Sequence, residues 1–228
     1  LLLGSTQLSH STAAMALALV LWTGLRAREG ATHWSVATGA AVGLAVGVRP
    51  WTGIVCSVAI LTTLWYSQAS ASTHPKARWL TRLSAVAVGG LPFAVLLFWW
   101  NATLFGNPLR LGYSAAFGPS HGLGFGVDPW GNQYGVLEAI GYTGADLGQL
   151  GIRLFESPIP ALALIGAALV ARPLRKGTHV FVAWALGAVA ANSVYWHHGI
   201  HMGPRMLLES APAWVVLLTA SVATLFGT

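Results

Sequence analysis

The chain has 228 residues, of which 55% are hydrophobic and only 8% are charged. Soluble domains carry about 25% charged residues, so this composition excludes an ordinary soluble enzyme and predicts an integral membrane protein. In a membrane protein the positions of the charges matter more than their sum, so the net charge of +6 does not indicate a nucleic-acid partner, and we expect none. The positions indicate how the chain is oriented in the membrane. The single cysteine, Cys56, lies in an apolar run and excludes an internal disulfide.

Apolar runs separated by charged or Gly/Pro-rich breaks predict an all-α bundle of about seven transmembrane helices, because a helix needs roughly 20 apolar residues to span a bilayer. All belong to one membrane domain that covers residues 1–228. We place the spans at about 1–25, 31–48, 51–67, 83–104, 158–171, 179–196 and 207–226.

The positive charges divide unequally between the two sides of this bundle. Basic residues mark the cytoplasmic side of membrane proteins. We therefore expect a multi-pass protein of the plasma (inner) membrane whose polar chemistry and active site face outward. The cytoplasmic side receives Arg26, Arg28, Lys76, Arg78, Arg82, Arg172, Arg175 and Lys176, and the outer side receives Arg49, Arg110, Arg153 and Arg205.

Arg49 is the first candidate functional residue, because it lies in the motif VRPWTG between two apolar runs. An ionisable residue near membrane depth is costly, and by default it faces a polar cavity and holds an anionic group. A phosphate suits this role, since arginine binds phosphate through charge-assisted, often bidentate hydrogen bonds.

The segment 105–157 is predicted to be a long external loop. Its first part combines glycine, aromatic residues and single polar side chains, among them Asp128, Trp130, Asn132 and Tyr134. Flat aromatic rings beside Asp and Asn suit the faces and hydroxyl groups of sugars. The alternative is an ordered loop that only packs on the helix ends. From about 136 to 155, apolar residues recur at helical spacing and predict a helix lying in the outer interface.

A second outer cluster is the segment YWHHGIHMGPRMLLES, with His197, His198, His201, Arg205 and Glu209. Glycine and proline disfavour a regular helix there, and the spacing offers no third ligand beside His198 and His201. We therefore expect no metal. Arg205 is a second candidate for phosphate binding, or it extends its head group to the interface from an apolar environment. His10, at the outer end of the first helix, lies on the same side.

Four motifs, SHST, VRPWTG, FGNPLRLGY and HHGIHMGPRMLLESAPAW, together resemble the polytopic GT-C glycosyltransferases. The closest likeness is to bacterial relatives of protein O-mannosyltransferases and aminoarabinose transferases. The resemblance implies that a sugar moves from a polyprenyl-phosphate carrier to a lipid, glycan or protein acceptor on the outer face, without a cofactor.

The resemblance also implies roles for individual residues. Arg49 and Arg205 are expected to hold the carrier phosphate. The family requires an acidic base in its first external loop, and we expect this chain to be the middle to C-terminal part of a longer enzyme that carries the base elsewhere. Asp128 is the best acid in the chain itself. The expected substrate-binding residues are His10, Tyr113, Asp128, Trp130, Asn132, Tyr134, His198, His201 and Glu209.

Three other functions remain open from the residues alone. A transporter or a flippase for lipid-linked sugars also places arginines at a polar cavity, although it more often shows two matching halves. An oligosaccharide polymerase or ligase also uses external Arg and His with a lipid-linked donor.

Overall fold

The computed structural model describes residues 2–69, 75–118, 122–128, 130–154, 159–171, 177–196 and 205–226. Within these ranges the chain is helical apart from loops and one two-stranded hairpin, which confirms the predicted all-α class. The chain divides into two compact units, residues 1–122 and 123–228, which we describe separately.

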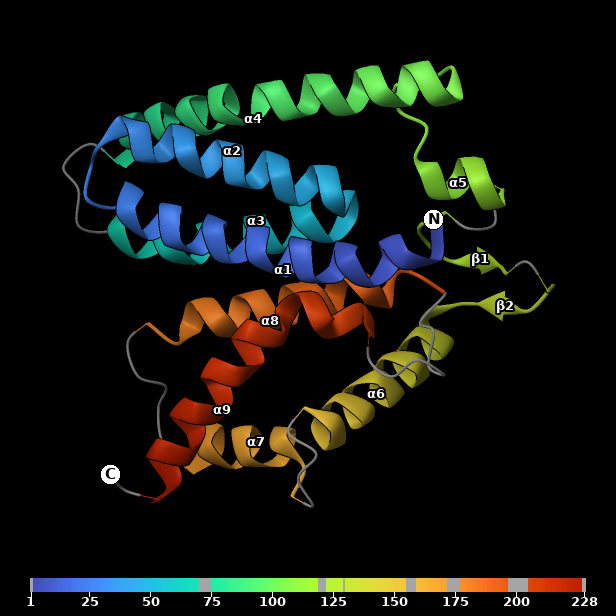
Figure 1. Cartoon of the computed structure of the whole chain (residues 1–228). Helices are drawn as coiled ribbons and strands as arrows, with labels where there is room; N and C mark the ends of the chain where they lie inside the picture. Colours follow the sequence, from blue (N-terminus) through green and yellow to red (C-terminus); the bar gives the residue numbers. More distant parts are fainter. Residues whose placement is uncertain are drawn as a thin grey trace. The chain divides into compact units, whose positions relative to one another are not determined.

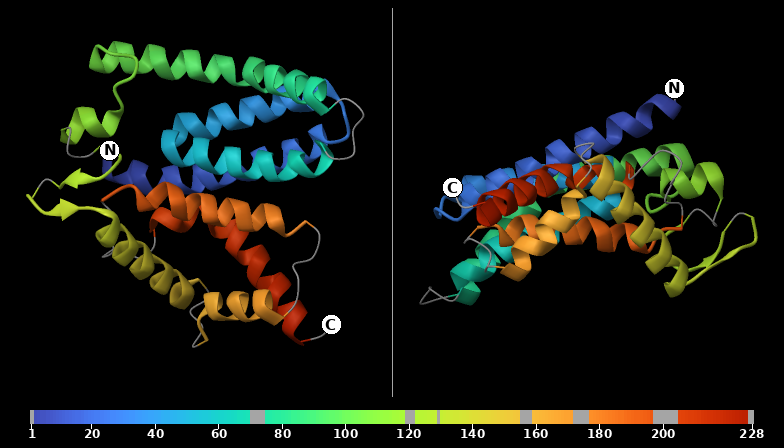
Figure 2. Two further views of the ribbon diagram at one scale, coloured as in Figure 1. Left: turned by 180° about the vertical axis from the view of Figure 1, so that it is seen from behind. Right: turned by 90° about the horizontal axis from the view of Figure 1, so that it is seen from below.

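In its described residues, the first unit has four long helices and one short helix (Figure 1). Helix α2 is central, because it packs against α1, α3 and α4. The long helices lie side by side in each view (Figure 2). The elements are α1 (Leu2–Ala27), α2 (Thr32–Val48), α3 (Pro50–Ala69), α4 (Pro75–Phe105) and α5 (Gly112–Phe117).

Glycines allow the backbones of α2 and α4 to touch. A Cβ atom on Gly39 would lie inside the contact distance of the Val86 carbonyl oxygen and 2.9 Å from the Gly90 nitrogen. One turn later, a Cβ atom on Gly43 would lie 2.6 Å from the Cβ of Phe93. The spacing Gly39-xxx-Gly43 is the small-residue pattern that lets membrane helices approach closely.

Arg82 joins the ends of three helices in this unit. Its side chain is 8% exposed, and its Nη2 donates hydrogen bonds to the carbonyl oxygens of Ala27 at 3.2 Å and Arg28 at 3.4 Å. Its guanidinium carbon also lies 5.7 Å from the ring centroid of Trp65 on α3. The charge thus satisfies carbonyl groups at the C-terminal end of α1, where a cation is favourable.

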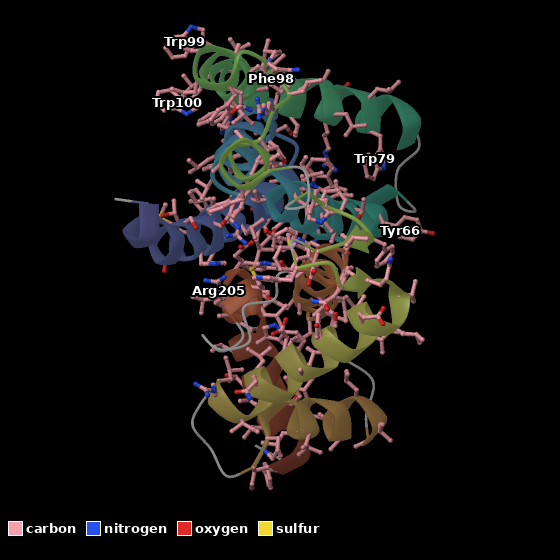
Figure 3. The ribbon with its side chains drawn as sticks, turned by 90° about the vertical axis from the view of Figure 1, so that its right-hand side faces the viewer. Tyr66, Trp79, Phe98, Trp99, Trp100 and Arg205 are labelled. Atoms are coloured by element: carbon pink, nitrogen blue, oxygen red, sulfur yellow. The ribbon has the colours of Figure 1, made fainter. Side chains whose placement is uncertain are left out.

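Aromatic residues lie at two levels of α4. Trp79 packs edge-on against Trp65, and beside it Tyr66 projects outward from α3 (Figure 3). Phe98, Trp99 and Trp100 project outward near the other end of α4 (Figure 3). The 20 residues between Trp79 and Trp99 rise about 30 Å at 1.5 Å per residue, which matches the hydrocarbon thickness of a bilayer.

The second unit begins with a hairpin and continues with helices (Figure 1). The strands pair antiparallel, with Gly126 opposite Tyr134 and Val127 opposite Gln133. Helix α9 packs against α7 and α8, and α6 packs against α7 and α8. The elements are β1 (Gly126–Val127), β2 (Gln133–Tyr134), α6 (Val136–Arg153), α7 (Ala161–Ala171), α8 (His179–Ser193), the 3-10 helix η3 (Arg205–Ser210) and α9 (Ala211–Phe226).

Two helical segments of the described chain are long and apolar enough to cross a membrane, Trp79–Phe105 and Arg205–Phe226. Shorter apolar helices cover Pro50–Tyr66, Ala161–Ala171 and His179–Ser193. Each of the seven predicted spans overlaps a helix, but the bundle of seven spanning helices is not confirmed. The predicted loop 105–157 contains α5, the hairpin and α6, so the helix expected at 136–155 is present.

Candidate functional site

Arg49 forms the whole connection between α2 and α3. A residue that precedes proline is disfavoured in the α conformation, and Arg49 accordingly has φ −141° and ψ 85°. Its N–H still donates to the Ala45 carbonyl at 2.9 Å, and its carbonyl accepts from the Gly53 N–H at 2.7 Å. A Cβ atom on Gly53 would lie 2.6 Å from the Ala45 carbonyl, so glycine is required for this tight elbow.

The Arg49 side chain reaches His10 on α1. Its Nη1 lies 3.4 Å from His10 Nε2, and the His10 side chain is only 3% exposed. Arginine has donors only, so a hydrogen bond here requires Nε2 to be the unprotonated nitrogen of a neutral imidazole. Two residues 39 positions apart in sequence, both predicted as site residues, are therefore neighbours.

Arg49 lies between the ends of two helices. It caps the C-terminus of α2, which carries a partial negative charge, and it precedes Pro50 at the N-terminus of α3, which carries a partial positive charge. Trp51 lies in the first turn of α3 with 38% of its side chain exposed. The guanidinium group of Arg49 is therefore the group that favours an anion at this elbow.

Arg205 and Glu209 lie in η3 of the second unit. Glu209 is completely buried, whereas Arg205 is half-buried. Asn192, at the C-terminal end of α8, donates from Nδ2 to the carbonyl oxygen of Met206 at 2.9 Å and so joins α8 to η3. Arg205 and Arg49 belong to different units, so their convergence on one phosphate stays a prediction.

Asp128 organises the turn between β1 and β2. Its Oδ1 accepts hydrogen bonds from the backbone N–H groups of Trp130 at 2.9 Å and Asn132 at 2.8 Å, and its Oδ2 accepts from Asn132 Nδ2 at 3.0 Å. Desolvation, the largest single influence, raises the pKa of Asp128. The hydrogen bonds from Asn132, Trp130 and Gly131 outweigh it, so the pKa lies below its ordinary value. A carboxylate held in this way is a weak proton acceptor.

Tyr134 and Trp130 have opposite exposures in the same hairpin. Tyr134 is 4% exposed, and its hydroxyl donates to the Ser193 carbonyl at 2.8 Å. Desolvation, together with the nearby groups of Tyr142, Asp146 and Glu138, raises the pKa of Tyr134 to about 12. Trp130 is 72% exposed and packs edge-on against Trp196 at 5.3 Å. Of these two aromatic side chains, Trp130 therefore offers the larger surface to a ligand.

The remaining predicted site residues are placed only in part. Tyr113 lies on α5 with 46% of its side chain exposed, beside Phe117. His197, His198 and His201 lie outside the described residues. Within the ranges that the structure describes, no three His, Cys, Asp or Glu side chains form a group that could hold a metal ion.

Asp146 is a buried acid that the sequence did not single out. Its side chain is only 2% exposed and is buried like that of Leu150 one turn later, whereas Ile140 is 65% exposed. Tyr142, one turn earlier on α6, stacks on Tyr134 with ring centroids 5.9 Å apart, so this side of the helix faces the hairpin.

Comparisons with protein-family models, curated proteins and solved structures gave no match to this chain. The resemblance to GT-C glycosyltransferases therefore rests on the short sequence motifs alone.

Proposed function

We propose that the protein transfers a sugar from a polyprenyl-phosphate donor to an acceptor on the extracytoplasmic face of the membrane, with Arg49 holding the donor phosphate. The observation that carries this proposal is the contact between Arg49 and the buried His10 at the start of α3. Both residues belong to motifs that resemble the GT-C family. Their contact supports one anion site rather than two unrelated polar residues.

The depth of Arg49 supports a lipid-linked phosphate. Phe93 of α4 lies beside Gly43 of α2, so neighbouring residues of these parallel helices differ in number by about 50. Arg49 then lies level with Trp99. If Trp79 and Trp99 occupy the two interfaces, as tryptophan prefers, Arg49 lies at the depth of lipid head groups. Transporters usually bind their substrates near the middle of the membrane, so this depth favours transfer over transport.

The chemistry that this site can contribute is stabilisation of the leaving group. Negative charge grows on the departing phosphate as the bond to the sugar breaks, and fixed cations that are already in place lower the barrier. The planar fork of Arg49 can bind two phosphate oxygens, and His10 positions that fork. Asp128 is committed to its turn, so we assign it no role as the base.

Binding of undecaprenyl phosphate to the protein in lipid nanodiscs tests this proposal, with undecaprenol as the ligand that lacks the phosphate. Arg49→Lys should weaken binding of the phosphate form about tenfold to a hundredfold, since a charge-assisted hydrogen bond contributes roughly 1.5–3 kcal/mol. Arg26→Lys is the matched control, because Arg26 is a half-exposed arginine of the same unit and lies outside the four motifs. His10→Gln should produce a smaller loss than Arg49→Lys.

Two results would contradict the proposal. Equal affinity for undecaprenol and undecaprenyl phosphate would show that the phosphate is not recognised. Unchanged binding by Arg49→Lys would remove Arg49 from the site. In the same assay Arg205→Lys tests the second arginine, which should behave like Arg49→Lys if both hold one phosphate.

A further inference from the structure

The hairpin and the start of α6 expose many large apolar side chains. Each of the seven is at least 48% exposed, and they come from a stretch of only 18 residues. Monomeric soluble proteins rarely expose large contiguous apolar patches, so such a surface marks a contact with lipid or with another protein. The residues are Leu123, Phe125, Val127, Trp130, Val136, Leu137 and Ile140.

The exposed face of α6 continues this surface. Leu137, Gly141, Ala145, Gly148 and Ile152 recur every three or four residues, and all five are exposed. None of them is charged or polar. The exposed charged residues of α6, Glu138 and Arg153, lie near its two ends. Between them α6 exposes an apolar stripe, whereas an amphipathic helix in water presents a polar face to solvent.

The other side of the hairpin is fixed to the helices of its unit. The Tyr134 hydroxyl binds the Ser193 carbonyl at 2.8 Å, and the Gly124 N–H donates to the Val194 carbonyl at 2.8 Å. Both acceptors lie at the C-terminal end of α8, beyond which the hairpin projects (Figure 1). The hairpin therefore holds a defined position at this helix end.

This helix end coincides with one end of an apolar segment that is long enough to cross a membrane. Asn192 joins the end of α8 to Met206, and the segment Arg205–Phe226 begins beside Met206. A structure attached there lies near the boundary between hydrocarbon and water. Tryptophan and other amphipathic aromatic residues are enriched at that boundary.

We propose that the hairpin and α6 form a lipid anchor, whose exposed apolar side chains lie in the boundary between head groups and acyl chains at the Arg205 end of the span. Few charges on this surface offer a protein partner electrostatic recognition. Asp128 is engaged in the turn, Glu138 binds the Gly135 N–H at 2.9 Å, Arg153 donates to Gln149 at 2.7 Å, and Asp146 is buried. The anchor goes beyond the proposed function, because it requires no phosphate or sugar.

Spin labels on the full chain in phosphatidylcholine nanodiscs test the anchor. Nitroxides are attached to single cysteines at Val127, Leu137 and Ala145, and to Arg110 as an exposed polar reference. Cys56 is completely buried, so it does not compete for the label. Collisions with oxygen, which concentrates in lipid, and with a water-soluble nickel chelate are then compared.

The anchor predicts that oxygen collisions exceed nickel collisions several-fold at Val127, Leu137 and Ala145, relative to Arg110. Nickel access equal to that at Arg110 would place this surface in water and overturn the proposal. Protection from both reagents would show that protein covers the surface, which also overturns it. No donor or acceptor is present, so the result is independent of the test with undecaprenyl phosphate.

Discussion

Replacing Gly39 by alanine adds one methyl group at the contact between α2 and α4. The new carbon would meet backbone atoms, including the carbonyl of Val86 and the nitrogen of Gly90 at 2.9 Å. No side-chain rotation can relieve such a clash. The two helices would have to move apart by about 1 Å, a gap that forfeits a quarter to a half of the dispersion energy of each contact.

The expected loss of stability follows from two opposing effects. Overpacking typically costs about 1–3 kcal/mol, and a rigid backbone contact favours the upper end of this range. Alanine also has a higher helix propensity than glycine, by about 1 kcal/mol. The net destabilisation of Gly39→Ala is therefore about 2 kcal/mol. Gly47 lies on the same helix with nothing within 4 Å of an added Cβ, so Gly47→Ala should gain up to about 1 kcal/mol.

Thermal unfolding in detergent, followed by circular dichroism, measures this difference. For a chain of this size, 2 kcal/mol corresponds to a decrease in Tm of about 4–8 °C for Gly39→Ala. Gly47→Ala should leave Tm unchanged or raise it by a few degrees. Equal shifts in the two variants would refute the close contact of α2 and α4.

Two further predictions concern polar groups. Arg82→Gln should lower the free energy of unfolding by about 2–3 kcal/mol in the same assay, because buried carbonyl groups lose a charged donor. Arg26 is exposed, so Arg26→Gln should cost less than about 1 kcal/mol. Burial raises the pKa of Tyr134 to about 12, compared with about 10 in the unfolded chain. The contribution of Tyr134 to stability is therefore complete below about pH 10 and is lost as the pH rises to about 12. Absorbance of tyrosinate should show a late-titrating group that Tyr134→Phe removes; identical titrations would contradict the buried hydroxyl.

Local sequence patterns predicted most of the helices. Apolar runs and Gly/Pro breaks place α2, α8 and α9 within a few residues of their observed bounds. The start of α4 was missed, because the prediction followed the apolar run from residue 83 whereas the helix begins at Pro75 and includes several basic residues. A search for Pro at a first helical position could have found this start.

Tertiary contacts were beyond the reach of the sequence. The side of the membrane assigned to His10 and Arg49 suggested proximity, but their contact depends on how α1 packs beside the elbow. The hairpin was missed because each strand has only two residues, and its turn depends on three hydrogen bonds to Asp128. The burial of Asp146, on the same face of α6 as Leu150, depends on how this helix packs in its unit, which no local pattern reveals.

The elbow at Arg49 also makes the length of the chain critical at this point. Loops usually tolerate insertions, since extra residues extend into solvent. Here one added residue would turn α3 by about 100° about its axis, given 3.6 residues per turn. Gly53 would leave the Ala45 carbonyl, and a larger residue would take its place. The connection from α2 to α3 can therefore vary in neither direction, and natural variants of this protein should keep its length unchanged even where their residues differ.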